Sequence, residues 1–309
     1  MRIAVMGTGG TGGYFGGLLA RAGEEVTFIA RGDHLEAIRK DGLAIKSVLS
    51  GDFSIPANAT DNTHDIGPVD VVLFCVKAYD NAAAADQIRP LTGPQTVVLS
   101  VQNGIDNEQQ IGEVIGPEHV VGCVSYVSSI IESPGVVAQT AGPGKIVLGE
   151  MQGGTSARTE ALQSMLQNSG ITAELHPDIQ TALWHKFLAI CGVNGITTLT
   201  RLPMGEILAC EETRKLLRGT MEEVEAVARA SGAVLPESCV DQSMDLFSSV
   251  EPAVRGSMYY DLAAGRRLEL DVINGTVVRL GGEHGIPTPI NFAIYAALKP
   301  YLNGQPSSS

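Results

Sequence analysis

The chain has 309 residues, of which 44% are hydrophobic and 18% are charged, so it is long enough for two domains with apolar cores. Its net charge of −13 disfavours binding to nucleic acid or to an acidic membrane surface, because the long-range field of the protein repels both. Five cysteines, an odd number without a CxxC pair, argue against a disulfide framework and against a zinc site. We expect no metal.

No targeting or membrane segment is evident. The N-terminus reads as a strand from residue 2, without a cationic stretch followed by an apolar one, and no apolar run approaches about 18 residues. The sequence therefore predicts a cytoplasmic protein that neither crosses nor binds a membrane.

A glycine-rich turn follows the first predicted strand. The strand at residues 2–6 runs into this turn, and a helix at 12–22 and a second strand at 25–30 come after it. Glycines at the first, third and sixth positions permit a sharp turn, the close approach of a pyrophosphate, and tight packing of the helix on the sheet. The alternative is a glycine-rich turn without a ligand. The pattern predicts a dinucleotide site at Gly7, Thr8, Gly9, Gly10, Thr11 and Gly12.

The end of the second strand decides which dinucleotide is expected. An NAD site usually places an acidic residue there for the ribose 2′-hydroxyl, whereas an NADP site supplies an arginine for the 2′-phosphate. This chain has Arg31. The alternatives are a solvated arginine in a polar loop at residues 31–34, or a role for the acidic Asp33, slightly later in the chain. We predict NADP as the cofactor.

The first half of the chain alternates between strands and helices. Valine-rich runs at residues 69–76 and 96–101 are typical of parallel strands covered on both faces, and a helix is predicted between them at 81–88. An inserted antiparallel pair is expected at 42–57. Further strands are predicted at 120–127, 136–140, 145–148 and 171–175.

Strand patterns stop after His176-Pro177, and helical patterns follow. They cover residues 179–192, 211–230, 236–249, 267–282 and 289–302. We predict an α/β protein with a Rossmann-type, doubly wound, mostly parallel sheet in an NADP-binding domain at 1–176. An all-helical substrate domain is predicted at 177–309. A ligand cleft is expected where the two domains meet.

Two polar residues follow neighbouring predicted strands. Lys77 comes directly after the apolar run at 71–76, and Asn103 follows the next strand in the same way. Open α/β sheets bind ligands at the carboxyl edge of their strands, so this pair suggests function. Each residue on its own is equally compatible with a capping or turn role.

A helical stripe in the second half contains Lys186 and Asn194, with Ile190 one turn from each. Its apolar neighbours place Lys186 at the margin of a buried face, where an ammonium group needs a partner or a purpose. The alternative is a lysine that extends past Trp184 to solvent. Glu269, on the predicted helix at 267–282, is the candidate partner of Lys186, although alone it would be read as a surface carboxylate.

Taken in order, these motifs resemble the ketopantoate reductase (2-dehydropantoate 2-reductase) family over about residues 1–302. The residues that carry the resemblance are the turn Gly7 to Gly12, Arg31, Cys75-Val76-Lys77-Ala78-Tyr79, Gln102-Asn103-Gly104, Trp184-His185-Lys186, Asn194, Ser257-Met258, Glu269-Leu270-Asp271 and Asn274-Gly275.

The resemblance implies an NADPH-dependent reduction of a 2-keto acid, with Lys186 and Glu269 as the catalytic pair. Lys186 would polarise the ketone and protonate the developing alkoxide, and Glu269 would orient the substrate or Lys186. Chemistry agrees, since a carbonyl that becomes an alkoxide needs a fixed cation and a proton source. His185 is a rival acid, but its neighbouring position turns it away from the Lys186 stripe.

The resemblance also implies the binding residues. Asn103 would contact both the cofactor and the substrate, Asn194 the substrate, and Ser257 the substrate carboxylate, while Lys77 would lie beside the nicotinamide ribose. Lys186 and Glu269 would contact the substrate as well.

Two positions depart from the family pattern. Ile190 stands where the family commonly has asparagine, and Gly195 stands where it commonly has proline. The predicted substrate is 2-dehydropantoate, and the alternative is a less polar 2-keto acid or 2-oxo compound. An NADP-binding sensor without catalysis is the alternative from another class, although the retained Lys186 and Glu269 argue against it. The oligomeric state is open, and a homodimer is one assembly to test.

Overall fold

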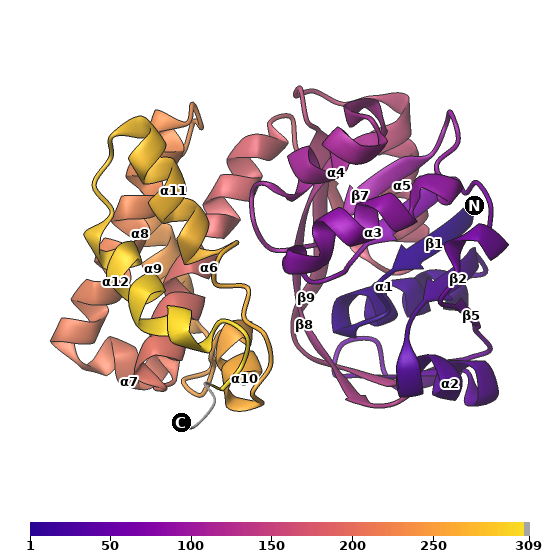
Figure 1. The fold of residues 1–309 in the computed structure, drawn as a ribbon, viewed down its shortest axis with the longest axis horizontal. Helices are drawn as coiled ribbons and strands as arrows, with labels where there is room; N and C mark the ends of the chain where they lie inside the picture. Colours follow the sequence, from indigo (N-terminus) through magenta and orange to yellow (C-terminus); the bar gives the residue numbers. More distant parts are fainter. Residues whose placement is uncertain (306–309) are drawn as a thin grey trace. The chain divides into compact units, whose positions relative to one another are not determined.

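The computed structural model describes residues 1–305 (Figure 1). The chain divides into two compact units. The first, here called the sheet unit, comprises Met1–Gln102 and Asp106–Ala182, and the second, the helical unit, comprises Asn103–Ile105 and Leu183–Ser309. The division near residue 182 falls inside a single long helix, α6 (Ile179–Thr200).

The described part of the sheet unit is built on one mixed sheet of ten strands, in the order β4-β3-β9-β8-β7-β6-β1-β2-β5, with β10 beside β9. All pairs are parallel except β3 with β4 and β8 with β9. The strands are β1 (Arg2–Met6), β2 (Glu25–Ile29), β3 (Leu43–Ser47), β4 (Phe53–Ile55), β5 (Asn58–Thr60), β6 (Val71–Phe74), β7 (Val97–Ser100), β8 (Val120–Ser133), β9 (Val136–Glu150) and β10 (Thr172–Leu175).

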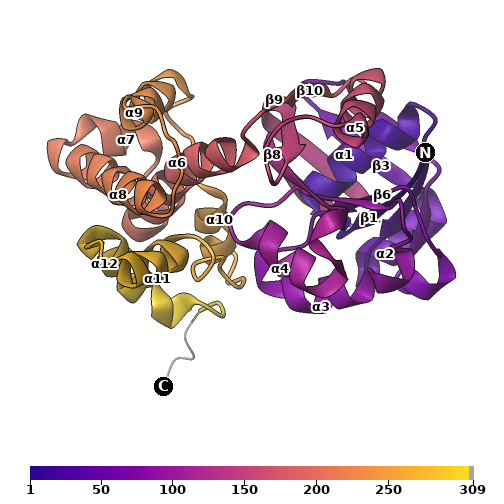
Figure 2. The same cartoon turned by 90° about the horizontal axis from the view of Figure 1, so that it is seen from above.

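Helices cover both faces of this sheet (Figure 2). Along β1, Ile3 and Val5 join the apolar cluster under α1 (Gly10–Arg21), α2 (Gly32–Asp41) and α5 (Ala157–Asn168). The alternate residues Ala4 and Met6 join the cluster under α3 (Asn81–Gln87) and α4 (Asn107–Ile115). This period of two on a continuously apolar strand is the reason the sheet is doubly wound. The predicted fold class is confirmed.

The helical unit has its own apolar core, to which Phe187, Met221, Val277 and Ile294 contribute. Its described residues form no strand. After α6 the helices are α7 (Met204–Ala209), α8 (Glu211–Ala230), α9 (Cys239–Ser249), α10 (Ser257–Ala263), α11 (Asn274–His284) and α12 (Pro289–Leu298). Single 3-10 turns lie at Thr63–Asp65, Ala78–Asp80, Arg89–Leu91, Pro117–His119 and Lys299–Tyr301.

Four predicted elements, two strands and two helices, were placed wrongly. The strands expected at 136–140 and 145–148 are one strand, β9, because Gly142 and Gly144 adopt φ of 83° and 61° and the ladder with β8 shifts register instead of ending. The helix expected at 179–192 continues to residue 200. The helix expected from 267 begins only at Asn274.

Tertiary contacts explain the last two differences. A Cβ at Gly192 would lie 3.0 Å from Leu217 Cδ1, so this glycine serves close packing inside α6 and does not end the helix. Residues 268–273 are held apart from α11 by other contacts: Leu268 N donates to Leu302 O at 2.9 Å, and the Asp271 carboxylate accepts bonds from Tyr295 and Lys299. Short helices α2, α4, α5, α7 and α10 were not predicted from the sequence.

All five cysteines lie in the described part of the chain and are free thiols, as the sequence predicts, and three of them are buried. No helix within residues 1–305 combines the length and the apolarity that crossing a bilayer requires.

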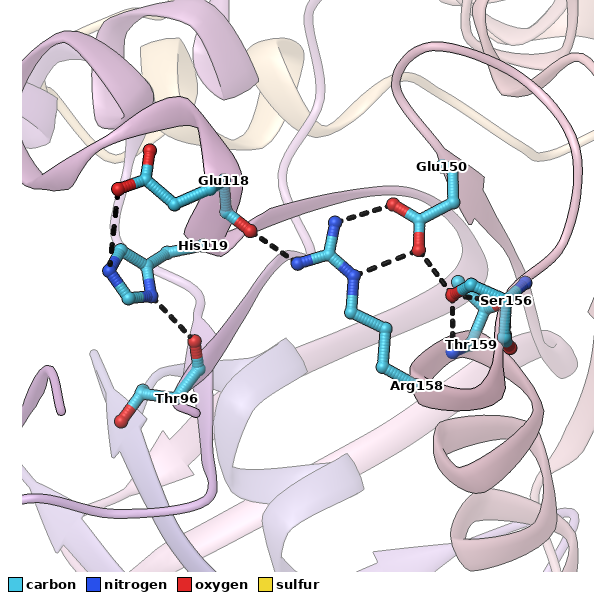
Figure 3. A network of polar contacts seen from close by, with 7 residues as sticks. All are labelled: Thr96, Glu118, His119, Glu150, Ser156, Arg158 and Thr159. Atoms are coloured by element: carbon cyan, nitrogen blue, oxygen red, sulfur yellow. Dashed lines mark hydrogen bonds and ion pairs between the residues drawn. The ribbon is translucent and has the colours of Figure 1, made fainter. Parts of the chain in front are cut away.

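A polar network lies at the amino ends of β7 and β8 (Figure 3). Glu150, at the end of β9, accepts bonds from Arg158 Nε at 2.8 Å and Nη2 at 2.5 Å, and from Ser156 Oγ at 2.5 Å. Arg158 also donates to the Glu118 carbonyl. His119 Nδ1 lies 2.8 Å from the Thr96 carbonyl. These contacts join the starts of two strands to the start of α5.

Candidate active site

The glycine turn after β1 combines close packing with open space. Gly7 has φ of 94°, and a Cβ there would lie 2.8 Å from Val76 N, while a Cβ at Gly12 would lie 2.3 Å from Gly7 O. Both positions exclude any other residue. A Cβ at Gly9 would meet nothing within 4 Å. Gly9 therefore borders space that a bound group can enter.

The first turn of α1 supplies the donors for such a group. Gly9 is the N-cap residue and has no side chain to occupy the free N–H groups of the turn. Thr8 is already engaged, since its N–H and its hydroxyl both donate to Ile29 O at 3.0 Å, which ties the turn to the end of β2. This donor set fits the pyrophosphate of a dinucleotide.

Arg31 follows β2 and is the N-cap residue of α2, so the polar loop considered at 31–34 is in fact the start of a helix. Its side chain is 74% exposed, and its Nη2 lies 3.9 Å from Asp80 Oδ2. An exposed pair at this distance contributes little stability, so Arg31 can exchange its partner for a phosphate at small cost. His34 Nδ1 accepts from Gly135 N at 3.0 Å, which anchors the first turn of α2.

The strands that lead to Lys77 and Asn103 are neighbours in register. Phe74, the last residue of β6, pairs with Ser100, the last residue of β7, and each polar residue comes three positions later. Lys77 is half-buried and is the N-cap residue of the 3-10 turn at Ala78–Asp80. Lys77 and Asn103 therefore both follow strands that end at the carboxyl edge of the sheet, where parallel sheets bind ligands.

The predicted stripe on α6 is present. Leu183 and Phe187 are 3% and 1% exposed, whereas Lys186 and Ile190 are half-buried, so Lys186 stands at the margin of the core. Burial lowers the pKa of His185, although a backbone contact with Cys239 opposes this effect. A neutral imidazole is a weak proton donor at neutral pH, which disfavours His185 as the acid.

Asn194 and Ser257 are brought together. Asn194 is 3% exposed, and its Oδ1 accepts from Met258 N at 2.9 Å and from Ser257 Oγ at 3.3 Å. Asn194 therefore caps the N-terminus of α10 through its side chain. A Cβ at Gly256 would lie 2.5 Å from the same oxygen, so glycine is required before Ser257. This capping role of Asn194 was not predicted from the sequence, although Gly256 directly before a helix that begins at Ser257 is a signal for it.

Glu269 lies between α10 and α11, not on a helix as predicted. It is 6% exposed, and its neighbours Leu268 and Leu270 are 1% and 0% exposed. Its carbonyl accepts from Val272 N at 3.1 Å and Ile273 N at 3.0 Å, which bends the chain into the start of α11. The reading of Glu269 as a surface carboxylate is excluded, because this residue is buried.

Close packing explains why residue 195 is a glycine. A Cβ at this position would lie 3.0 Å from Asn274 Nδ2, which itself donates to Asn291 Oδ1 at 2.9 Å. Gly195 makes room for a buried amide pair between α6 and the helices α11 and α12. Its departure from the family pattern therefore reflects core packing.

A doubly wound sheet with a dinucleotide-type turn is the architecture of a dinucleotide-binding protein. Sequence comparison agrees: the family description "Ketopantoate reductase PanE/ApbA" matches residues 3–153, and "Ketopantoate reductase PanE/ApbA C terminal" matches residues 178–302. The chain belongs to the ketopantoate reductase family, and it is an oxidoreductase of the kind that acts on CH–OH groups.

Individual relatives cover nearly the whole chain. A 2-dehydropantoate 2-reductase of Mesorhizobium japonicum is 32% identical over 97% of both chains. The crystal structure of a PanE/ApbA family ketopantoate reductase from Ralstonia eutropha JMP134 has a TM-score of 0.90 and 34% identity, covering 97% of this chain and 98% of its own. A complex of D-mandelate dehydrogenase with NADH has a TM-score of 0.88 and 25% identity, with coverage of 97% and 98%.

Proposed function

We propose that this protein reduces a 2-keto acid to the 2-hydroxy acid with NADPH, and that its substrate is 2-dehydropantoate, which becomes pantoate. The observation that carries the proposal is the place of Lys186, half-buried at the margin of the α6 core in a chain of this family. An ammonium group there is partly shielded from water, so it interacts strongly with a developing negative charge.

Each residue has a defined task in this proposal. Lys186 polarises the ketone oxygen and gives it a proton as the carbonyl carbon receives a hydride, which NADPH supplies when bound. Glu269 orients Lys186 or the substrate, and Ser257 holds the substrate carboxylate. Asn194 acts on the substrate by fixing the backbone at the start of α10, as the 2.9 Å bond from Met258 N supports. The Ser257 hydroxyl, whose 3.3 Å bond to the same oxygen is long, turns toward the carboxylate when the substrate binds.

The phosphate groups of the cofactor are assigned to the sheet unit. The open space beside Gly9 and the donors at the start of α1 support a pyrophosphate there, and the exposed guanidinium of Arg31 supports a 2′-phosphate. Lys77 and Asn103 are assigned to the nicotinamide end, because they follow adjacent strands at the carboxyl edge. We therefore propose NADPH and not NADH.

A less polar 2-keto acid is the second candidate substrate. Ile190 stands one helical turn from both Lys186 and Asn194 and is half-buried among the apolar residues of the helical unit. A branched hydrocarbon there would leave a substrate hydroxyl without a partner and would favour an alkyl or aryl group. The likeness to a D-mandelate dehydrogenase, whose name specifies an aryl 2-hydroxy acid, supports the same alternative.

The experiment is a comparison of 2-keto acids as oxidants of NADPH, followed by absorbance. 2-Dehydropantoate, 2-ketoisovalerate and phenylglyoxylate represent the hydroxylated, alkyl and aryl classes. We expect 2-dehydropantoate to give the highest kcat/KM. A higher value for either of the other two identifies the second candidate as the substrate class, and no turnover with any of them contradicts the proposal.

We also propose that the reaction takes place in the cytoplasm and that the enzyme is a homodimer. Light scattering of the purified protein tests the assembly directly, since a mass near 32.4 kDa would identify a monomer.

A further inference from the structure

A chain of buried amides crosses the carboxyl edge of the sheet. Gln102 Nε2 donates to Val76 O at 2.6 Å and to Asn81 Oδ1 at 2.7 Å, and Ser100 Oγ donates to Gln102 Oε1 at 3.2 Å. Asn81 Nδ2 in turn donates to Asn107 Oδ1 and to Gln110 Oε1, both at 2.9 Å. We call Ser100, Gln102, Asn81, Asn107 and Gln110 the amide network.

The donors and acceptors of the amide network can be assigned in only one way. Val76 O can only accept, so the nitrogen of Gln102 must face it, and its second hydrogen then fixes the oxygen of Asn81. All polar atoms of these two amides have partners. Gln102 and Asn81 are 7% and 2% exposed, and burying such groups is costly unless they are fully bonded.

The network joins the two connections that carry candidate site residues. Val76 directly precedes Lys77, and Gln102 directly precedes Asn103. Asn81 is the first residue of α3 and Asn107 is the first residue of α4, the helices that follow these two connections. A single side chain, Gln102, therefore links the exit of β6 to the exit of β7.

We propose that Gln102 is a positioning residue, which fixes the exits of β6 and β7 relative to each other, directly before Lys77 and Asn103, and thereby sets the place of the nicotinamide and of the ketone that it reduces. Gln102 itself touches neither reactant. This inference rests on the proposed function, because that function assigns Lys77 and Asn103 to the same ligand, the nicotinamide end of NADPH. Its physical basis is that a shift of about 1 Å in reacting groups can lower a rate by two orders of magnitude.

The same two strands offer a matched control at their other end. Thr96 Oγ1 donates to Val69 O at 2.5 Å and accepts from Gly93 N at 2.8 Å, so it links the starts of β6 and β7. Thr96 is 3% exposed. Gln102→Met removes the three side-chain hydrogen bonds of Gln102, and Thr96→Val removes those of Thr96 Oγ1 with Val69 O, Gly93 N and Leu91 O. Both changes nearly conserve volume. Only the first lies beside candidate site residues.

The test compares Gln102→Met, Thr96→Val and wild type in kcat with NADPH and in Kd for two ligands. These ligands are NADPH and adenosine 2′,5′-bisphosphate, which lacks the nicotinamide. For Gln102→Met we expect kcat to fall about tenfold or more and the Kd of NADPH to rise about threefold to tenfold. The Kd of the fragment should stay within about twofold. For Thr96→Val we expect a lower melting temperature with all three values within about twofold.

Gln110→Ala is a milder variant, since Gln110 is exposed and the change removes only one of the two acceptors of Asn81 Nδ2. It should shift the same quantities in the same direction by about twofold to fivefold. Equal weakening of NADPH and of the fragment, or an unchanged kcat in Gln102→Met, would overturn the proposal and leave Gln102 a purely structural residue.

Failure of the proposed function is recognised separately. Wild type that binds NADPH but reduces no 2-keto acid contradicts the function, while the ratio of the two Kd values still decides the role of Gln102. Wild type that binds neither ligand overturns both proposals.

Discussion

The two ends of the parallel sheet use polar residues differently. At the amino end, the Glu150 carboxylate accepts bonds from both the Arg158 guanidinium and the Ser156 hydroxyl, so these polar groups have partners within the protein (Figure 3). At the carboxyl end, the glycine turn leaves open space beside Gly9, and Arg31 is 74% exposed, with its Nη2 3.9 Å from Asp80 Oδ2. Polar groups that hold the chain have their partners inside the protein, whereas those that can meet a ligand face outward.

This difference predicts which variants change stability and which change chemistry. Changes at the amino end should lower the free energy of unfolding without altering turnover. Changes at the exposed or half-buried candidate residues of the carboxyl edge and of α6 should alter turnover or binding at nearly constant stability, whereas changes at the buried Gln102 and Asn81 should affect both. Denaturant unfolding of each variant below is measured beside its kinetics or binding, so each prediction tests this comparison.

Lys186→Ala should have the largest effect. Removal of the acid should lower kcat by about 10²–10⁴-fold, while the Kd of NADPH stays within about twofold because the cofactor phosphates are assigned to the sheet unit. Steady-state kinetics and cofactor titration measure the two values. Lys215→Ala, which removes an exposed lysine paired with Glu211 on α8, is the control and should change neither. Near-normal turnover of Lys186→Ala would contradict Lys186 as the acid and would leave His185 as the candidate.

Arg31→Ala should weaken NADPH selectively. A charge-assisted bond from the guanidinium to the 2′-phosphate contributes about 1.5–3 kcal/mol, or about one to two decades in Kd, and NADH lacks this phosphate. Titration of both cofactors checks this. Arg39→Ala is the control, since Arg39 lies in the last turn of the same helix and contacts Ala59 O and Glu36. Equal affinities of wild type for NADPH and NADH would exclude the assignment of Arg31.

Glu150→Gln should lower stability alone. Loss of the charged bonds to Arg158 should cost about 1.5–3 kcal/mol in the free energy of unfolding, with kcat unchanged. Bonds from Arg158 hold the pKa of Glu150 below its usual value near 4.5, so the contribution is present above that pH and is lost as pH falls through the lower, folded-state pKa. Denaturant unfolding of both proteins at pH 7 and in acid should therefore show a difference that shrinks in acid. A fall in kcat that corresponds to as many kcal/mol as the loss of unfolding free energy would contradict the separate roles of the two sheet ends.

Ile190→Asn should have the smallest effect, on substrate choice. An added amide can pair with a substrate hydroxyl, which is worth about 1–3 kcal/mol in kcat/KM for 2-dehydropantoate relative to 2-ketoisovalerate. Ala189→Asn, at the half-buried neighbouring position of α6, is the control and should leave this ratio unchanged. Leu183 is too deeply buried for such a control. An unchanged ratio in Ile190→Asn would show that the hydroxyl is recognised elsewhere.

Features with a local cause could be predicted from the sequence. The glycine turn, the strands before Lys77 and Asn103, and the α6 stripe follow from steric limits and periodicity within about 20 residues. Features caused by distant contacts could not. The burial of Glu269 depends on a segment held by Leu302 and Lys299, and the capping role of Asn194 depends on a helix that starts 63 residues later. The role proposed for Gln102 likewise depends on Asn81, 21 residues away, and no local pattern marks such a pair.

The central claim is the reduction of a 2-keto acid by NADPH, and the most direct measurement is the stoichiometry of that reaction. Wild type is mixed with excess 2-dehydropantoate and a limiting amount of NADPH, and the products are quantified by mass spectrometry. The account predicts one pantoate for each NADPH consumed, and almost none with Lys186→Ala in the same time. Oxidation of NADPH without formation of the 2-hydroxy acid, or tight NADPH binding with no oxidation by 2-dehydropantoate, 2-ketoisovalerate or phenylglyoxylate, would contradict it.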